Sequence, residues 1–235
     1  MIQEKSTNNG LSTFTLKCIA IVTMALDHGA AVLLAPNNSY YLILRLIGRT
    51  SFPIFCFLIA EGAYHTKNIK QYALRLGIFA LISELPFNLA FYGSYSSPYH
   101  QNVFFTLFLG LIVIAFHKLL VRYNKKYLSC LFLFLGMYIA SLMKTDYGAQ
   151  GVLLIYIFYI SRNITNFRLP IYILGILMLS LNIYTIINSI QIFAIISIIP
   201  IFMYNGGKGK NLNKYAFYSF YPVHLIVLYF LAKYI

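Results

Sequence analysis

The sequence predicts an all-α fold, a polytopic membrane helix bundle with about nine transmembrane helices and a cytoplasmic N-terminus. Hydrophobic residues make up 60% of the 235 positions and charged residues only 10%. The mean hydropathy is +0.74. Because lipid offers no hydrogen-bond partners to the backbone, apolar segments of about 20 residues are expected to be helices. We therefore expect a multi-pass protein of the cell membrane.

Nine apolar stretches follow one another, separated by short polar connections. They cover residues 15–35, 41–63, 72–92, 103–121, 127–143, 149–161, 169–187, 190–204 and 216–234. The sixth and eighth are short, because a span needs about 20 residues. Residues 1–14 form a polar N-terminal segment, and no linker divides residues 15–235, which we take as one transmembrane domain.

Lysine and arginine are concentrated in every second connection. They lie before or at the start of the first span, or at and after the ends of the second, fourth, sixth and eighth: Lys5, Lys17, Lys67, Lys70, Arg75, Lys118, Arg122, Lys125, Lys126, Arg162, Arg168, Lys208, Lys210 and Lys214. Because such residues accumulate on the cytoplasmic side, the N-terminus is expected there and the C-terminus outside. The net charge of +13 therefore reflects topology in a lipid bilayer, and no nucleic acid is expected as a partner.

The three cysteines, Cys18, Cys56 and Cys130, stand singly in apolar stretches. They lack the paired spacing of a zinc site or a disulfide framework, so no metal is expected. The first span begins with Lys17 in the manner of a signal peptide, but Asp27-His28 interrupts it and no small-residue cleavage site follows. We expect this span to be retained.

Four of the five acidic residues lie within or at the edge of apolar stretches: Asp27, Glu61, Glu84 and Asp146. An unpaired charge at the bilayer centre costs about 2.5 to 3.5 kcal/mol on the insertion scale. A chain with so few carboxylates has little structural reason to place them there, so they are candidates for chemistry, binding or transport. For Glu61, near the inner end of its span, a solvated position is the alternative.

The pair Asp27-His28 lies past the middle of the first span. Adjacent helical residues diverge by about 100°. One side chain can face a cavity while the other turns to a neighbouring helix, or both can border a polar seam where the carboxylate holds the imidazole's tautomer. That arrangement suits a general base. The structural alternative is a hydrogen-bonded pair that fixes helix packing.

Arg45 and Arg49, four residues apart in the second span, share one helical face. Pro53 follows them, removes a backbone donor and can bend the helix toward a cavity. Because arginine does not lose its proton, each guanidinium needs a carboxylate, carbonyls, water or an anionic ligand. Both are therefore candidates for substrate binding, with a buried ion pair between helices as the alternative.

Glu84 and Asn88 stand at i, i+4 around Pro86 in the third span. A proline frees backbone carbonyls, and broken helices of this kind commonly border binding cavities. The alternative is a proline kink whose freed groups Asn88 satisfies. Asn102, which leads into the fourth span, is a further polar candidate.

Two more pairs are candidates. Asp146 and Tyr147 precede the sixth span, where Asp146 can also stabilise the helix N-terminus through the dipole. Tyr221 and His224, three residues apart in the last span, share a face and can meet the first-span pair across the bundle, or can simply bond each other. The other histidines are expected at the surface: His65, His100 and His117.

In their order along the chain, these groups resemble the TraX family of membrane proteins, which is allied to the transmembrane acyltransferases. The resemblance rests on Lys17-x-x-Ala20 through Asp27-His28, Arg49-x-x-Phe52-Pro53-x-Phe55, Glu84-x-Pro86-Phe87-Asn88, Asp146-Tyr147-Gly148-x-x-Gly151 and Phe217-Tyr218-x-x-Tyr221-Pro222-x-His224. Each block alone is weak, whereas five in sequence are fairly specific.

The resemblance implies that residues 15–235 form an acyltransferase-like domain that moves an acetyl group from cytoplasmic acetyl-CoA to an amine or hydroxyl within the membrane or at its outer face. His28 would be the base that deprotonates the acceptor, and Asp27 would orient it. Arg49 would steady the oxyanion or a CoA phosphate. An acetyl-histidine intermediate and direct transfer both remain open.

The other candidates are expected to bind substrate or acetyl-CoA: Arg45, Glu61, Glu84, Asn88, Asn102, Asp146, Tyr147, Tyr221 and His224. The basic turn at Gly206 to Lys210 can contact phosphates, although the topology bias alone also explains its lysines. A peptide N-terminus, a sugar and a glycolipid all remain open as acceptors. The sequence does not indicate the oligomeric state.

Two other functions use the same residues. A proton-coupled secondary transporter also needs embedded Asp, Glu, His and Arg side chains, and it predicts flux without acetyl-CoA. The absence of a convincing internal repeat in the sequence counts against it. A membrane scaffold explains the bundle but leaves the cost of the buried polar residues unexplained.

Overall fold

The computed structural model describes residues 10–180, 190–211 and 213–234. The α-helices are α1 (Thr13–Leu33), α2 (Ser39–Gly48), α3 (Ser51–His65), α4 (Ile69–Tyr92), α5 (Val103–Arg122), α6 (Ser129–Leu142), α7 (Gly148–Ile160), α8 (Arg168–Leu177), α9 (Ile198–Phe202) and α10 (Lys214–Tyr234). Short 3₁₀ segments cover Lys126–Leu128, Ser161–Asn163, Met178–Ser180 and Gln191–Ser197. Across these ranges no strand forms, so the all-α class is confirmed for them.

Within the described ranges, five helices are long and apolar enough to cross a membrane, judged by length and composition. They are Thr13–Leu33, Ser39–His65, which joins α2 and α3, Ile69–Tyr92, Val103–Arg122 and Lys214–Tyr234. Shorter apolar helices cover Lys126–Leu142, Arg168–Ser180 and Gln191–Phe202. The end of the predicted stretch 169–187 lies outside the described residues, as do residues 1–9. The count of about nine crossings and the side of the N-terminus stay predictions.

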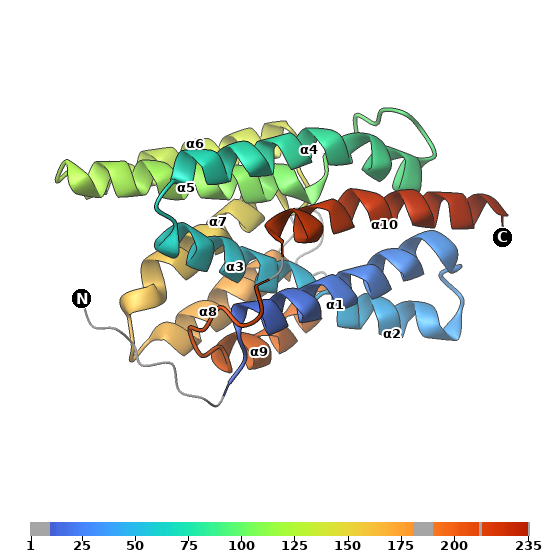
Figure 1. The fold of residues 1–235 in the computed structure, drawn as a ribbon, viewed down its shortest axis with the longest axis horizontal. Helices are drawn as coiled ribbons and strands as arrows, with labels where there is room; N and C mark the ends of the chain where they lie inside the picture. Colours follow the sequence, from blue (N-terminus) through green and yellow to red (C-terminus); the bar gives the residue numbers. More distant parts are fainter. Residues whose placement is uncertain (1–9, 181–189, 212, 235) are drawn as a thin grey trace.

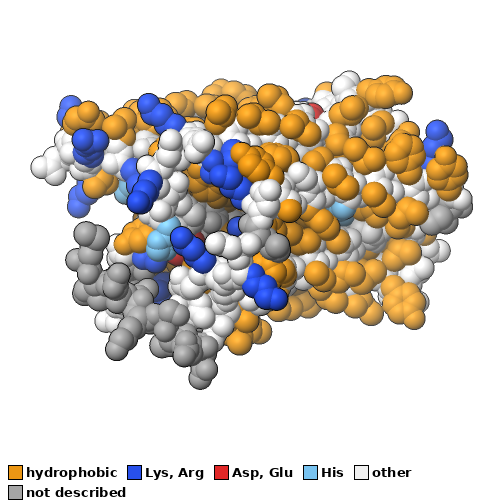
Figure 2. Space-filling view, in the orientation of Figure 1, with side chains coloured by type: hydrophobic (Ala, Val, Ile, Leu, Met, Phe, Trp, Pro, Cys, Tyr) orange, Lys and Arg blue, Asp and Glu red, His pale blue; other side chains and the backbone are white. Residues whose placement is uncertain are grey.

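The surface suits a lipid environment. Large apolar side chains are exposed on several helices, including Leu81 on α4, Phe134 on α6 and Leu174 on α8. Figure 2 shows hydrophobic side chains over much of the visible face, whereas most of the Lys and Arg side chains gather toward one end. Because soluble monomers rarely expose contiguous apolar patches of this kind, these faces are expected to contact lipid.

The predicted second span is interrupted once. α2 ends at Gly48 and α3 begins at Ser51, so Arg49 and Thr50 form the junction between them. In a continuous helix the amide of residue 53 would bond the carbonyl of Arg49, and Pro53 has no such donor. Pro53 instead lies in the first turn of α3, where a missing amide hydrogen is tolerated. The interruption is thus at the arginine itself, four residues before the proline.

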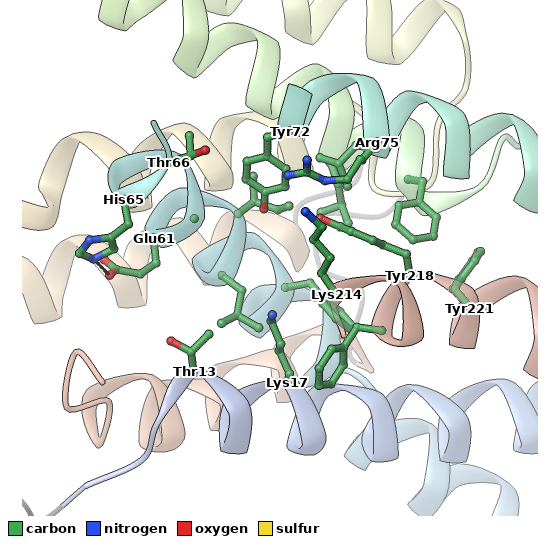
Figure 3. A pocket seen from close by; sticks show the side chains of 18 of the residues that line it. Thr13, Lys17, Glu61, His65, Thr66, Tyr72, Arg75, Lys214, Tyr218 and Tyr221 are labelled. Carbon is green, nitrogen blue, oxygen red and sulfur yellow. Dashed lines mark ion pairs between the residues drawn. The ribbon is translucent and has the colours of Figure 1, made fainter. Parts of the chain in front are cut away.

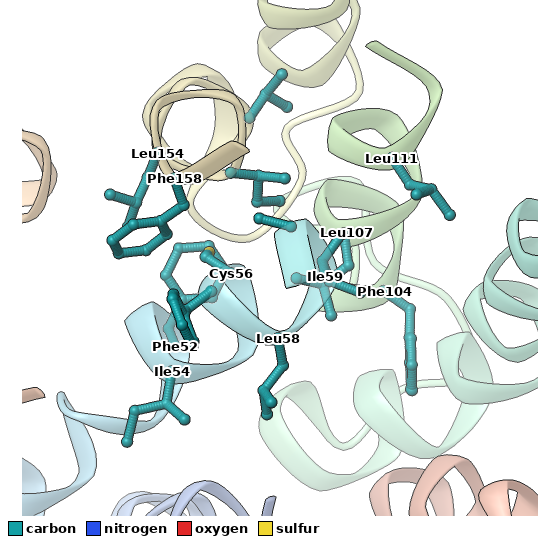
Figure 4. Close-up of a cluster of buried hydrophobic side chains, with 14 of the residues drawn as sticks. Phe52, Ile54, Cys56, Leu58, Ile59, Phe104, Leu107, Leu111, Leu154 and Phe158 are labelled. Carbon is teal, nitrogen blue, oxygen red and sulfur yellow. The ribbon is translucent and has the colours of Figure 1, made fainter. Parts of the chain in front are cut away.

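The core is built around α3, which contacts α1, α5 and α7 (Figure 1). Most residues of α3 are buried, because it lies between layers of helices and faces little lipid. Figure 4 shows apolar core side chains of α3 together with others of α5 and α7: Phe52, Ile54, Cys56, Leu58 and Ile59; Phe104, Leu107 and Leu111; and Leu154 and Phe158. α10 packs along α4 and α1, so the first and last helices of the chain are neighbours.

Candidate active site

A cavity of about 310 Å³ lies among α1, the α2–α3 junction, α4, α10 and the turn before α7; we call it the histidine cavity. Seven of the predicted site residues line it: Asp27, His28, Arg45, Arg49, Asp146, Tyr147 and Tyr221. Aromatic side chains form much of its remaining wall: Phe52, Phe55, Phe87, Phe91 and Tyr92. The structure thus brings these seven residues together, and their roles stay predictions.

His28 is bonded to the histidine of the last helix. Its Nδ1 lies 2.8 Å from Nε2 of His224, and Nδ1 of His224 lies 2.8 Å from the carbonyl oxygen of Phe220. The ring centroids of the two histidines are 5.1 Å apart and the ring planes differ by 9°, as an in-plane bond between ring edges requires. α1 and α10 are therefore joined through two imidazoles.

This chain of bonds assigns the tautomer of both neutral rings. The Phe220 carbonyl only accepts, so Nδ1 of His224 carries the hydrogen and its Nε2 is an acceptor. Nδ1 of His28 must then donate to that Nε2, which leaves Nε2 of His28 with its lone pair. An imidazole held in one tautomer with a basic nitrogen available on a cavity wall is suited to take a proton from a bound group.

The expected partnership between Asp27 and His28 is wrong. The Asp27 carboxylate is buried and pairs with the two arginines: its Oδ2 lies 3.0 Å from Nη1 of Arg45 and also contacts Nη2 of Arg49. Adjacent positions on α1 diverge by about 100°, so the carboxylate turns toward α2 while the imidazole turns toward α10. His224 takes the orienting position that the sequence suggested for Asp27.

Gly48 permits this ion-pair cluster. A Cβ atom on Gly48 would lie 2.2 Å from the Cβ of Asp27, so any other residue there would overlap the carboxylate. α1 and α2 can approach closely only because position 48 has no side chain, as at other close helix crossings in membranes. Arg45, one helical turn before Gly48, and Arg49, the residue after it, then both reach Asp27.

The two arginines differ in how many of their side-chain nitrogens have a partner. Arg49 donates from Nε to the Arg45 carbonyl and from Nη1 to Tyr147 Oη (3.4 Å) and Gln191 Oε1 (3.2 Å), in addition to its pair with Asp27. Arg45 contacts its described neighbours through Nη1 alone. Arg49 is thus held on all three nitrogens, whereas Nε and Nη2 of Arg45 are available to a ligand in the cavity.

Asp146 and Tyr147 lie in the turn that leads into α7. The Asp146 backbone bonds Gln101 and Thr106, and the ring of Tyr147 stacks on Phe52 with centroids 3.6 Å apart. Burial raises the pKa of the Asp146 carboxyl to about 6, although the nearby Arg49 opposes the shift. The N-cap position of α7 is Tyr147, without a side-chain bond, so Asp146 stands one residue before the cap, and its stabilisation of the helix through the dipole stays a prediction.

Glu84, Asn88 and Asn102 form a separate clamp. Glu84 accepts bonds from Asn88 Nδ2 (3.2 Å), from Asn102 Nδ2 (2.6 Å) and from the Asn102 amide (3.2 Å). None of the three lines the histidine cavity. α4 continues through Pro86, so the predicted broken helix is wrong. The carboxylate is instead satisfied at the start of α5, where these residues tie two helices together.

We expect Asn102→Ala to destabilise the fold without changing the site. Asn102 is fully buried, also bonds the Ala80 carbonyl, and caps α5 through its bond from the Phe104 amide. Losing the cap and a donor to a buried carboxylate costs about 2 to 4 kcal/mol. The thermal unfolding midpoint in detergent should fall, with function per folded molecule retained. Asn38→Ala, at the exposed cap of α2, is the matched control and should shift the midpoint much less.

Glu61 lies apart from the histidine cavity. It is buried toward the C-terminal end of α3, where its carboxylate lies 2.6 Å from Nε of Arg162 and 3.4 Å from Nε2 of His65. The solvated alternative is therefore wrong, because the carboxylate is paired. Glu61 instead lines a second cavity of about 360 Å³, which we call the basic cavity and which is bounded by α1, α3, α4, α5, α10 and the residues between α9 and α10 (Figure 3).

The sequence interpretation did not name His100 and Gly48 as residues of the histidine cavity, nor Gln191 as a partner of Arg49. His100 is exposed, which confirms the surface position expected from its loop context, and it also lines the cavity from the connection before α5. Gly48 and Gln191 carry no local signal, because their roles depend on the approach of α1 and of the segment Gln191–Ser197. In the described part of the chain, no three His, Cys, Asp or Glu side chains gather to hold a metal ion.

Comparison of the sequence with known proteins shows the family of this chain. The sequence pattern of the TraX protein family matches residues 12–232, which run from the cap of α1 to near the end of α10. The chain belongs to the TraX family. The family match spans all the predicted site residues of this TraX protein and confirms the resemblance seen in its motifs.

A relative from Dichelobacter nodosus, a probable fimbrial assembly protein named FimC of serogroup H1, is 30% identical to this TraX chain over 241 residues. The match covers 95% of the TraX chain and 96% of the relative. No solved structure matches.

Proposed function

We propose that this TraX protein is an integral membrane acetyltransferase that moves an acetyl group from acetyl-CoA to an amine or hydroxyl of an acceptor. The observation that carries the proposal is the bonded chain His28, His224 and Phe220, because it leaves a basic nitrogen on the wall of a cavity that charged side chains also line. Such a nitrogen suits the proton transfer that acetylation needs.

His28 acts as the general base. As the acceptor oxygen or nitrogen attacks the thioester carbonyl, its proton passes to Nε2 of His28. The positive charge that forms on His28 is shared with His224, which in turn is bonded to the Phe220 carbonyl. His224 is thus a positioning residue, which fixes the tautomer in the way that a carboxylate does in hydrolase triads.

Arg45 stabilises the developing oxyanion. The attacked carbonyl oxygen becomes negative, and a pre-positioned donor in a site of low dielectric lowers the energy of that charge. Arg49 is occupied on all three nitrogens, whereas Arg45 keeps Nε and Nη2 available. The proposal therefore moves the oxyanion role from Arg49, where the family resemblance suggested it, to Arg45.

The bonds and the proton of this reaction are accounted for by the acceptor, acetyl-CoA and His28. A bond forms between the acceptor atom and the acetyl carbon, and the carbon–sulfur bond of acetyl-CoA breaks. The proton taken by His28 passes to the departing thiolate, so the products are the acetylated acceptor and the free thiol of CoA. His28 returns to its neutral form without any further reactant.

We place the basic cavity on the cytoplasmic side. It is lined by residues that flank the basic connections, including Lys17, Lys208 and Lys214, and basic connections accumulate in the cytoplasm. Acetyl-CoA then arrives from the cytoplasm, and the protein is a multi-pass protein of the cell membrane.

The test is acetyl-CoA turnover by the purified wild-type protein in lipid nanodiscs. Acetyl-labelled acetyl-CoA is supplied with three acceptor classes in parallel: a peptide with a free N-terminus, a sugar and a glycolipid. The peptide comes first, since a relative is named for fimbrial assembly. We expect label on one class together with an equal amount of free CoA thiol. If no class is labelled and no thiol is released, the enzymatic proposal fails.

A further inference from the structure

The basic cavity contains more positive charge than its own side chains neutralise. Four cationic side chains line it from four parts of the chain: Lys17 on α1, Arg75 on α4, Lys208 between α9 and α10, and Lys214 on α10. Figure 3 shows Arg75 and Lys214 close to the hydroxyl end of Tyr218, with Lys17 on the facing helix. None of these four cations forms an ion pair with a carboxylate of the described residues.

The one carboxylate on this wall is already occupied. Glu61 pairs with Arg162 and His65, so it does not neutralise the four cations. Arg75 in addition has a buried Nε that finds no hydrogen-bond partner among the described residues. An unsatisfied buried donor is costly, and an anionic ligand in the cavity would accept its bond and pair with the cations beside it.

A glycine-containing turn holds Lys208 at this cavity. The amides of Thr13 and Phe14 donate to the carbonyls of Gly207 (2.8 Å) and Lys208 (3.1 Å), which fixes the turn against the start of α1. Gly209 has a φ of +69°, and a Cβ atom there would lie 2.2 Å from Oγ of Ser12. The position of Lys208 is thus built into the fold.

The two cavities are adjacent. Four residues line both of them: Met24, Phe55, Val103 and Tyr221. These side chains are apolar or aromatic, and together they separate the cationic wall of one cavity from His28 in the other. A ligand that occupies both cavities therefore needs a strongly anionic end and a slender, uncharged arm.

We propose that the basic cavity binds the phosphate groups of a CoA thioester, through Arg75, Lys208 and Lys214 together with Lys17, while the uncharged arm passes between Met24, Phe55, Val103 and Tyr221 toward His28. This inference rests on the proposed function and adds a binding site to it. Phosphate oxygens accept several charge-assisted bonds at once, which suits cations converging from separate elements.

The experiment measures the binding of unlabelled CoA itself to the full-length protein in nanodiscs of phosphatidylcholine. We expect Arg75→Gln and Lys214→Gln each to weaken binding by about 10- to 100-fold, as expected for the loss of a bond to a charged group. Lys208→Gln, at an exposed position of the turn, is a third variant that does not depend on packing within the bundle. Arg122→Gln, at the exposed end of α5 and outside both cavities, is the matched control and should bind as the wild type does.

Two further arms identify the source of the phosphate. CoA lacking its 3′-phosphate should bind more weakly than CoA to the wild type, and the difference should shrink in the variants. Nanodiscs containing phosphatidylglycerol test whether the site belongs to a lipid headgroup. If the anionic lipid displaces CoA completely and the variants lose that displacement, the cavity is a lipid site and the inference is overturned.

The inference and the proposed function can fail separately. CoA binding that depends on Arg75 and Lys214, without any acetyl transfer, supports the binding site and removes the enzymatic proposal. Acetyl transfer that depends on His28, with the same KM for acetyl-CoA in wild type, Arg75→Gln and Lys214→Gln, leaves the enzyme intact and overturns the binding site.

Discussion

Replacing His28 with Gln is expected to lower acetyl transfer by about 10²- to 10⁴-fold, the range that a general base contributes. Glutamine keeps a similar volume and can still bond Nε2 of His224, so the contact between α1 and α10 is retained. It has no basic nitrogen to take the acceptor's proton. The measurement is release of free CoA thiol from acetyl-CoA with the acceptor class that the wild type uses.

The control for this variant is His117→Gln. His117 lies in α5, where its Nδ1 is 2.9 Å from the Tyr156 hydroxyl, and it lines neither cavity. Its turnover should match that of the wild type. Turnover by His28→Gln equal to that of His117→Gln, with both proteins folded, would mean that His28 is not the base.

His224 provides a graded version of the same experiment. In His224→Ala the tautomer of His28 is no longer fixed, so kcat should fall while the KM for acetyl-CoA changes little. His224→Gln can accept the bond from Nδ1 of His28 and should recover part of the rate. A purely structural role would predict that both variants lose stability to the same degree as activity.

Asp27→Asn is expected to destabilise the protein by about 3 to 5 kcal/mol, since removing one partner leaves buried charge unpaired. The Asp27 carboxylate is shared by Arg45 and Arg49, and its side chain is 8% exposed. Asparagine keeps the shape but not the charge, so the two guanidiniums lose the carboxylate that they share. Acetyl transfer should fall as well, because Arg45 borders the proposed oxyanion position.

Stability can be followed through Cys56, because the chain has no tryptophan. Cys56 is fully buried on α3, so its rate of reaction with a thiol dye on heating reports unfolding of the core. Cys130 is exposed and Cys18 is partly exposed, so both are replaced with Ser in the background used for every variant. The unfolding midpoint of Asp27→Asn should lie well below that of its parent.

A second substitution separates charge from packing. Adding Arg45→Gln to Asp27→Asn removes one of the two unpaired charges and should recover part of the lost stability, a coupling that a double-mutant cycle measures. If Asp27→Asn is as stable as the parent protein, the shared carboxylate is not what holds α1 and α2 together. The same conclusion follows if Arg45→Gln destabilises the Asp27→Asn variant as much as it destabilises the parent.

Helical class, apolar stretches and the acidic residues and arginines of the site were accessible from the sequence, because each leaves a local signal. Hydropathy marks segments that need a lipid environment, and a charge within such a segment is costly enough to indicate a purpose. Asp27, His28, Arg45 and Arg49 stand out on those grounds. The partner of each of these residues was not accessible, because a position in a helix sets the direction of its side chain but not which residue of another helix lies in that direction.

The sequence by itself determined that this is an all-α membrane protein of the TraX family with charged residues placed among apolar ones. Only the tertiary structure decided which groups meet. His28 bonds His224, a residue 196 positions away, and Glu84 is satisfied by Asn102 instead of facing a cavity. The physical reason is that periodicity and burial energy act over a few residues, whereas the packing of α1 against α2 and α10 depends on the whole bundle.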